Sequence, residues 1–173
     1  TNAVEEMLFG CMRLLEGDFR KTFSVSLFSH EIDDAASMQH VSRFSSKDPA
    51  SLLQLAKELV RIFSDRLDVR TLRKLSNHPE KEKLGSNKLL QNILAQKAGE
   101  ARAREVFAAI VGAYDMRLGD AHPTSSKIGE ALKLAGIDTA ASYLRQGEQL
   151  IGNFGHAVWF IGSLLFGDHE KSE

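Results

Sequence analysis

The chain has 173 residues, 43% of them hydrophobic, and its 22 lysines and arginines nearly balance 23 aspartates and glutamates, for a net charge of -1. This length and composition suffice for one hydrophobic core. The charge balance excludes a global basic field that would hold nucleic acid indiscriminately, so any RNA contact has to be local.

The N-terminal sequence predicts a cytoplasmic protein, because it carries Glu5 and Glu6 and lacks the basic start and apolar run of a secretory signal. The single cysteine, Cys11, excludes an internal disulfide framework and fits a reducing compartment. We expect its thiol to be buried and inert. The chain begins at Thr1 instead of methionine, so two interpretations stay open: one complete helical domain, or one helical domain cut from a longer protein.

Proline is scarce and apolar residues recur at helical spacing, which predicts an all-α fold, a multi-helix bundle. The first helix is expected over residues 4–15, ending at Gly17, and Asp18 is placed to cap a second helix through residues 19–28.

The clearest helix lies within residues 46–67, where Asp48 is the expected N-cap and Pro49 the first helical residue. A shorter helix is expected around residues 69–75, followed by a polar stretch at 77–87 that is the best candidate for an internal linker.

The second half of the chain begins with a long helical pattern over residues 86–114, in which Gly99 and Gly112 are expected to be tolerated. A short helix over residues 128–134 should stop at Gly136. The single domain, 1–173, therefore divides into N-terminal helices at 1–78 and core helices at 86–173.

The final helix is expected to be a long core helix with Asp138 as its N-cap and a stripe of apolar residues from Leu144 to Leu165. Three glycines in it, Gly152, Gly155 and Gly162, would permit close approach by neighbouring helices. Residues 150–167 are apolar, but they only approach the length of a membrane span, so we predict a buried helix and no membrane.

The sequence YDMRLGDAHPTSS, residues 114–126, gathers charged, imidazole and hydroxyl groups between two helical patterns. In an uninterrupted helix Arg117 and His122 would point about 140° apart. Gly119, Asp120 and Pro123 favour a break that could bring the two side chains together. A guanidinium binds phosphate oxygens and an imidazole transfers protons near neutral pH, so the pair suits metal-independent cleavage of RNA.

The segment MRLGDAHPTSSKIGEAL, at the end of one long helix and before another, resembles the signature of the HEPN superfamily, an arginine followed after four to six residues by a histidine. The resemblance covers roughly residues 86–168. It implies a helical bundle of the kind found in metal-independent ribonucleases of toxin–antitoxin and abortive-infection systems, with Arg117 stabilising phosphate and His122 as general acid and base.

The same resemblance implies a homodimer whose two motifs form one composite site, RNA as the substrate, and an antitoxin or a larger defence protein as a partner. It implies neither a metal nor another cofactor. Five residues are possible supporting groups by their proximity in sequence or their chemistry: Tyr114, Asp120, Ser125, Ser126 and His156.

A second interpretation is a non-catalytic helical module that binds a protein or a nucleotide, or that dimerises. Leu118 stands where the family usually has a polar residue, and an alignment with six intervening residues would put Asp115 in place of the arginine. In this interpretation Arg117 pairs with Asp115, Asp120 or Glu130 on the surface.

In the same interpretation His122 caps a helix end or satisfies a buried carbonyl group, Ser125 or Ser126 caps the next helix, and His156 is a core residue. His30 and Asp34 have the spacing of two metal ligands on one helix face, but a solvated acidic face is the preferred interpretation.

Overall fold

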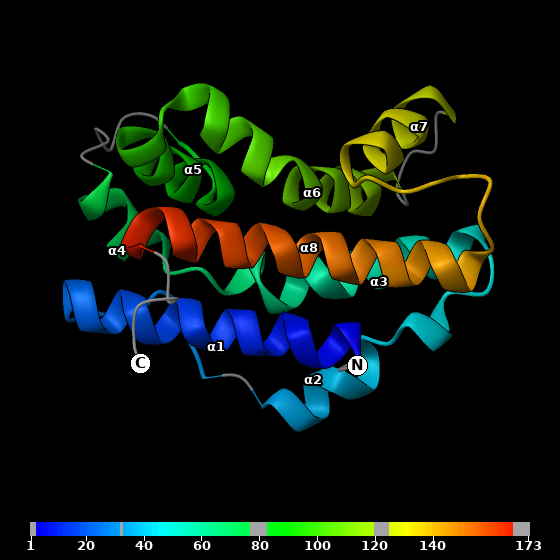
Figure 1. The fold of residues 1–173 in the computed structure, drawn as a ribbon, viewed down its shortest axis with the longest axis horizontal. Helices are drawn as coiled ribbons and strands as arrows, with labels where there is room; N and C mark the ends of the chain where they lie inside the picture. Colours follow the sequence, from blue (N-terminus) through cyan, green and yellow to red (C-terminus); the bar gives the residue numbers. More distant parts are fainter. Residues whose placement is uncertain (1–2, 32, 77–82, 120–124, 168–173) are drawn as a thin grey trace.

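The computed structural model is a bundle of α-helices and describes residues 3–31, 33–76, 83–119 and 125–167 (Figure 1). Within these residues there are eight α-helices and two 3₁₀ helices. The elements are α1 (Val4–Phe23), α2 (Asp34–His40), η1 (Arg43–Ser45), α3 (Pro49–Ile62), η2 (Ser64–Arg66), α4 (Val69–Leu75), α5 (Ser86–Ala98), α6 (Glu100–Gly119), α7 (Ser125–Leu134) and α8 (Tyr143–Phe166). The predicted all-α bundle with a long final helix is confirmed.

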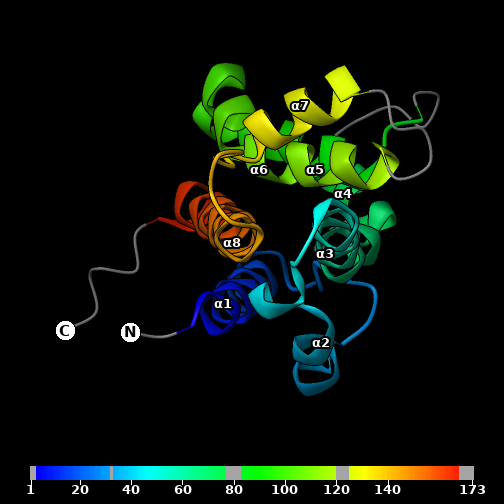
Figure 2. The ribbon, with the colours of Figure 1, turned by 90° about the vertical axis from the view of Figure 1, so that its right-hand side faces the viewer.

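The first and last helices lie side by side and run in the same direction (Figures 1 and 2). Glycines of α8 face α1, where a Cβ at Gly155 would lie 3.0 Å from Met7 Cε and one at Gly162 would lie 3.7 Å from Leu15 Cδ1. A Cβ at Gly152 would also be in van der Waals contact with α1. The missing side chains let the two backbones approach closely, as predicted.

The centre of the core is formed by phenylalanines from three parts of the chain. The Phe63 ring, at the end of α3, meets the rings of Phe28 and Phe154 edge to face, with centroids 5.8 and 5.6 Å apart. All three side chains are buried. Because Phe63 directly precedes η2, this packing fixes the position of η2 on the bundle.

Helix α3 begins as the sequence predicts, with Pro49 in its first turn and Asp48 as the N-cap. The Asp48 carboxylate accepts a hydrogen bond from the Ser51 backbone N–H at 2.7 Å. This bond, together with the Ser51 hydroxyl, lowers the pKa of Asp48. The apolar stripe of α3, including Leu52, Leu55 and Leu59, is buried as expected.

Three helix ends differ from their sequence predictions. Helix α1 continues through Gly17 to Phe23, because the apolar face continues into Phe19 and glycine is tolerated inside a helix. Gly99 separates α5 from α6, because it adopts a φ of 87° that ends α5. The N-cap of α8 is Ser142, whose side chain accepts from the Arg145 N–H, so the prediction of Asp138 is wrong.

Helix α7 packs against the C-terminal half of α6 through Gly112. A Cβ at Gly112 would lie 2.5 Å from the backbone nitrogen of Ala135 and 2.7 Å from the carbonyl oxygen of Ala131. Helix α7 begins at Ser125, three residues earlier than the apolar pattern indicates, and Gly136 follows its end with a φ of 70°. The close packing at Gly112 therefore fixes where the chain re-enters the bundle after α6.

Among the helices that the structure describes, α8 alone is long and apolar enough to cross a bilayer, judged by length and composition. Half of its most apolar window is buried within the bundle. Core helices of soluble proteins meet the same test, so the feature is weak evidence for a membrane span.

Candidate functional site

Arg117 lies in the last turn of α6 and its side chain reaches across to η2. Its Nη1 lies 2.8 Å from both carboxylate oxygens of Asp65. The Arg117 side chain is 33% exposed and that of Asp65 43% exposed. The guanidinium carbon also lies 5.8 Å from the ring centroid of Tyr114, one turn earlier in α6. Arg117 is thus a partly exposed cation that already holds an oxyanion.

The partner of Arg117 is not one that the sequence indicated. Asp65 is 52 residues away along the chain and is brought close by the packing of α3 on α6. Glu130 and Asp115 were the expected surface partners among the described residues. Asp115 lies two positions from Arg117 on the same helix, and residues at that spacing do not face each other.

Asp115 sits in a different environment from Arg117. Burial raises the pKa of its carboxyl group above the ordinary value. Leu118, the apolar residue after the arginine, is one of the large exposed hydrophobic side chains. The end of α6 therefore presents Arg117 toward η2 while Leu118 faces solvent.

Only some of the predicted site residues can be placed. His122 and Asp120 lie in the segment 120–124, outside the described residues. Tyr114 is beside Arg117, as a supporting residue should be. Ser125 and Ser126 form the start of α7, so Ser126, which is exposed, is a first-turn residue and not the N-cap.

His156 is exposed on α8, so the expectation of a core histidine is wrong. It lies on the solvent-facing side of a helix whose opposite side carries the buried Phe154 and Val158. The described contacts of Arg117 are with Asp65 and Tyr114, and His156 is not among them. The predicted support from His156 requires it to lie near His122, which is outside the described residues, so it stays a prediction.

A pocket of about 380 Å³ lies beside the Arg117–Asp65 pair. It is bounded by η2, by Val111 and Tyr114 of α6, and by the first turn of α5. The N-cap of α5 is Gly85, which supplies no side-chain hydrogen bond, and the first turn of α5 contains no acidic residue. The first backbone N–H groups of a helix have no intrahelical acceptor, so this turn presents donors to the pocket.

Sequence reasoning missed the first turn of α5 as part of the site. The sequence GSNK, residues 85–88, looked like the end of a linker and the start of a helix. The available signal was a glycine in the N-cap position followed by a turn that holds a lysine and no carboxylate. That signal gives no indication that the turn lies against α6.

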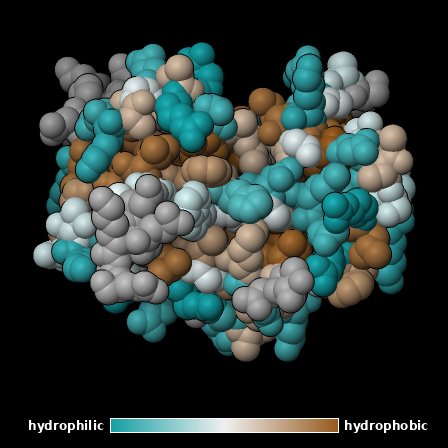
Figure 3. All heavy atoms as spheres, in the orientation of Figure 1, coloured by the Kyte–Doolittle hydropathy of each residue, from teal (hydrophilic) through white to brown (hydrophobic). Residues whose placement is uncertain are grey.

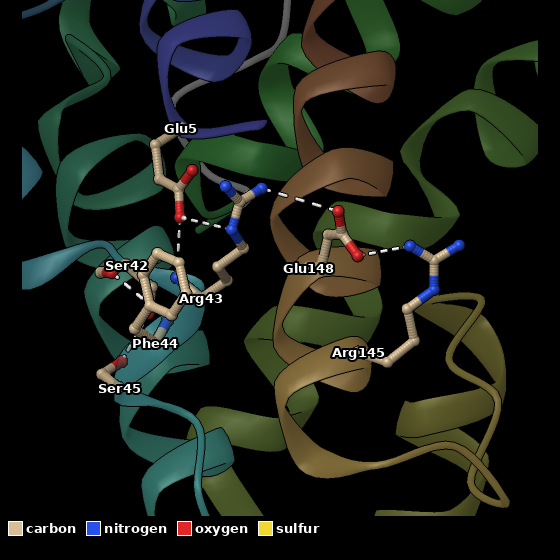
Figure 4. Close-up of polar contacts among 7 residues, drawn as sticks. All are labelled: Glu5, Ser42, Arg43, Phe44, Ser45, Arg145 and Glu148. Carbon is tan, nitrogen blue, oxygen red and sulfur yellow. Dashed lines mark hydrogen bonds and ion pairs between the residues drawn. The ribbon is translucent and has the colours of Figure 1, made fainter. Parts of the chain in front are cut away.

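A second arginine, Arg43, lies at the centre of another polar cluster (Figure 4). Its Nη1 is 3.6 Å from Glu148 Oε1 and its backbone N–H donates to Glu5 Oε1 at 2.8 Å. Glu148 also binds Arg145. Because these residues come from α1, η1 and α8, the cluster connects three elements, and its arginine is enclosed by carboxylates instead of facing a pocket.

A further cluster of opposite charges lines a pocket of about 430 Å³ between α1, the start of α2 and the end of η2. Each of its three arginines is engaged: Arg13 binds Asp34, Arg20 binds Glu16, and Arg66 donates to the His30 carbonyl oxygen. Asp34 is thus an ion-pair partner in the structure. No group of three or more histidine, cysteine, aspartate or glutamate side chains suited to a metal occurs within the described residues.

Cys11 is buried in α1, as predicted. Burial raises the pKa of its thiol, which disfavours the reactive thiolate.

Comparison with protein-family models, with curated proteins and with solved structures finds no match to this chain. The resemblance of residues 86–168 to the HEPN superfamily therefore depends on the sequence motif alone.

Proposed function

We propose that the chain is a metal-independent RNA endonuclease of the HEPN type, acting in a prokaryotic defence or toxin–antitoxin system. The observation that supports the proposal is the state of Arg117: a partly exposed guanidinium that binds a carboxylate through Nη1 alone, beside a pocket of about 380 Å³. His122, five residues further along the chain, supplies the proton-transferring group.

In the proposed reaction the ribose 2′-oxygen attacks the adjacent phosphorus while a His122 imidazole takes its proton. The bond from phosphorus to the 5′-oxygen breaks, and that oxygen receives a proton from a protonated histidine. The products are a 2′,3′-cyclic phosphate and a 5′-hydroxyl. Arg117 stabilises the negative charge that builds up on the phosphate oxygens.

Arg117 has to exchange or share its present partner to do this. An exposed ion pair contributes at most about 1 kcal/mol, so its exchange costs little. Both contacts with Asp65 use Nη1, and a guanidinium carries five N–H donors. The pair with Asp65 is therefore compatible with a phosphate arriving at the other nitrogens.

The proposal includes a homodimer that joins two Arg117–His122 motifs, as the family resemblance implies. Sedimentation velocity at micromolar concentration should give about twice the mass of the 19.1 kDa chain. A chain that stays monomeric would contradict the composite site.

The decisive experiment is incubation of the purified protein with RNA in EDTA. Wild type should leave cyclic phosphate ends, and His122→Ala should lower the rate at least about 100-fold, the usual minimum for general acid–base catalysis. His40→Ala, which removes an exposed histidine at the end of α2, is the matched control and should cleave as wild type does. No cleavage by wild type would overturn the enzymatic proposal.

The engagement of Arg117 by Asp65 favours a second candidate, a module that binds a nucleotide or RNA without cleaving it. In that case the carboxylate is the resting partner of a binding arginine. Binding of RNA by wild type and His122→Ala alike, with no cyclic phosphate from either, would favour this candidate.

A further inference from the structure

We propose that the first turn of α5 binds a phosphate group of the RNA, next to the phosphate held by Arg117. The identity of the ligand as RNA rests on the proposed function. The presence of an oxyanion subsite rests on the pocket itself.

The donors of this subsite are the backbone N–H groups at residues 86–88 and the Lys88 ammonium. Gly85 leaves the turn without a side-chain cap, and no carboxylate stands in the turn to neutralise it. All four residues of 85–88 line the pocket. Free N–H groups, the positive end of a 13-residue helix and a lysine together favour an anion.

An independent observation points to a ligand in the same pocket. Ser64 is 2% exposed and lines the pocket, and its Oγ has no hydrogen-bond partner among the described residues. The Ser64 carbonyl oxygen accepts from the Ser86 hydroxyl at 2.8 Å, which places Ser64 directly against the first turn of α5. A buried hydroxyl without a partner is costly, so a ligand oxygen that accepts its proton would remove an existing penalty.

Asn87 supplies the complementary group. Its Oδ1 is also buried and has no partner in the part of the chain that the structure describes, and Asn87 lines the same pocket. An amide oxygen accepts hydrogen bonds, so it suits a ligand hydroxyl such as that of ribose. A ligand with both acceptor oxygens and a hydroxyl would satisfy Ser64 and Asn87 together, and a ribonucleotide has both.

The remaining polar groups that line the pocket in the described residues do not oppose this assignment. Asp65 brings a negative charge to the pocket, but Arg117 lies 2.8 Å from it and offsets that charge. Gln91 adds an amide. Tyr114 is partly exposed, lines the pocket and contacts Arg117, so a base stacked on its ring would lie between the two phosphate positions.

The test measures binding of a labelled single-stranded RNA by fluorescence anisotropy at several salt concentrations, in the His122→Ala background so that the RNA stays intact. Lys88→Gln should weaken binding about tenfold and reduce the slope of log K against log salt by about 0.7, the value for one contact with a single strand. Lys97→Gln, at the other end of α5 and outside the pocket, should stay within about twofold of its parent.

Ser64→Ala separates a ligand contact from a structural role. Because the Oγ has no partner, its removal should leave the free energy of unfolding unchanged or raised, while RNA binding weakens about threefold to tenfold, the equivalent of one lost hydrogen bond. Binding by Lys88→Gln and Ser64→Ala that equals that of Lys97→Gln would overturn the subsite. That result would leave the cleavage experiment untouched.

A second measurement distinguishes RNA from free phosphate. Inorganic phosphate titrated into ¹⁵N-labelled protein should shift the amide resonances of residues 86–88, and the RNA should displace it. Amide resonances of residues 86–88 that still respond to inorganic phosphate when the protein is saturated with RNA would overturn the assignment to RNA. Loss of both the shifts and the Lys88 effect would overturn the subsite altogether.

Discussion

Arg43 and Arg117 are two arginines with opposite surroundings. Arg43 is 24% exposed, with Glu5 and Glu148 within 4.0 Å, and it connects elements from both ends of the chain. Within the described residues Arg117 has one carboxylate partner, sits above a tyrosine ring and lies beside a pocket. The difference is in what each cation could exchange: Arg43 would have to leave two carboxylates and a tertiary junction, whereas Arg117 would leave one exposed carboxylate.

This contrast shows that an arginine in an ion pair can still belong to a site. Exposed pairs contribute little to stability, so they are easily exchanged, while enclosed networks are costly to break. We therefore expect substitutions around Arg43 to change the free energy of unfolding and substitutions around Arg117 to change the chemistry on RNA.

The largest effect should come from Arg117→Ala, which removes the group proposed to stabilise the phosphate. We expect RNA cleavage to fall about 100-fold or more, the usual loss for one donor to a developing oxyanion. Arg102→Ala is a matched control, since Arg102 lies on the same helix, pairs with Glu105 at 2.7 Å and lies over the Phe160 ring. Equal cleavage rates for the two variants would remove Arg117 from the site.

Two glycines test the packing around the two arginines, Gly112 near Arg117 and Gly147 near Arg43. A Cβ at Gly112 would clash with the backbone of α7, and one at Gly147 would lie 2.7 Å from Ser46 Cβ beside η1. Chemical denaturation should show that Gly112→Ala and Gly147→Ala each destabilise by about 1–3 kcal/mol, as expected for overpacking.

Only Gly112→Ala should also reduce cleavage at a concentration where both variants are folded. Helix α7 carries the chain away from the 120–124 segment, and small displacements of catalytic groups reduce rates strongly. A Gly147→Ala variant that lost cleavage to the same extent would mean that the two regions are coupled.

Arg43→Ala should reduce stability and leave RNA cleavage unchanged, the opposite of what we expect for Arg117→Ala. It leaves Glu5, whose side chain is 13% exposed, without its cation, and we expect the free energy of unfolding to fall by about 1–2 kcal/mol because a partly buried charged group loses its partner. Cleavage by the folded variant should be unchanged. A change in cleavage without a change in the urea midpoint would contradict the structural role of Arg43.

The sequence predicted most elements of the bundle because their signals are local. Asp48 and Pro49 mark the start of α3 by their own chemistry, and the glycines of α8 mark a close helix contact. The errors lie at helix ends such as Gly99, where a glycine inside a long helical pattern can either continue the helix or end it in a left-handed conformation. Local composition does not decide between these outcomes; packing of α5 against α6 does.

The candidate site could be predicted only in part. Tyr114 and Arg117 are the first and fourth residues of one short sequence motif, so the same motif indicates both. Asp65 and Ser64 come from a different element, and their approach to α6 depends on Phe63 packing against Phe28 and Phe154. One sequence carries no direct signal for such a distant contact.

A smaller effect should follow from removing the charge of Asp65, the carboxylate that competes with an RNA phosphate for Arg117. Asp65→Asn keeps the shape of the side chain but removes its charge, so Arg117 is freed and the pocket becomes more positive. We expect RNA binding at low salt to tighten by up to about fivefold, in line with an exposed pair of about 1 kcal/mol or less. Glu58→Gln, which frees Arg61 on α3, is the control, and an equal gain there would indicate a general charge effect.

The smallest effect should appear as opposite pH dependences of stability near the two arginines. Burial raises the pKa of Asp115, so the ionised form of its carboxyl group disfavours folding. The resulting loss of stability develops as pH rises from the unfolded-state pKa of about 3.9 through the folded-state pKa. Asp115→Asn should therefore gain stability relative to wild type over that rise, by less than about 0.5 kcal/mol, as for a surface substitution.

Asp48, which follows the Arg43 segment, has the opposite shift, because hydrogen bonds from Ser51 lower its pKa. Its ionised form favours folding, and this contribution is present above the unfolded value of about 3.9 and is lost as pH falls through the folded pKa. Asparagine also caps helices well, so Asp48→Asn isolates the titration from the cap. In urea unfolding between about pH 3 and 7 it should lose stability relative to wild type as pH rises, whereas Asp115→Asn gains it. Parallel curves for the two variants would contradict the contrast between a carboxylate stabilised by its cap and one disfavoured by its burial.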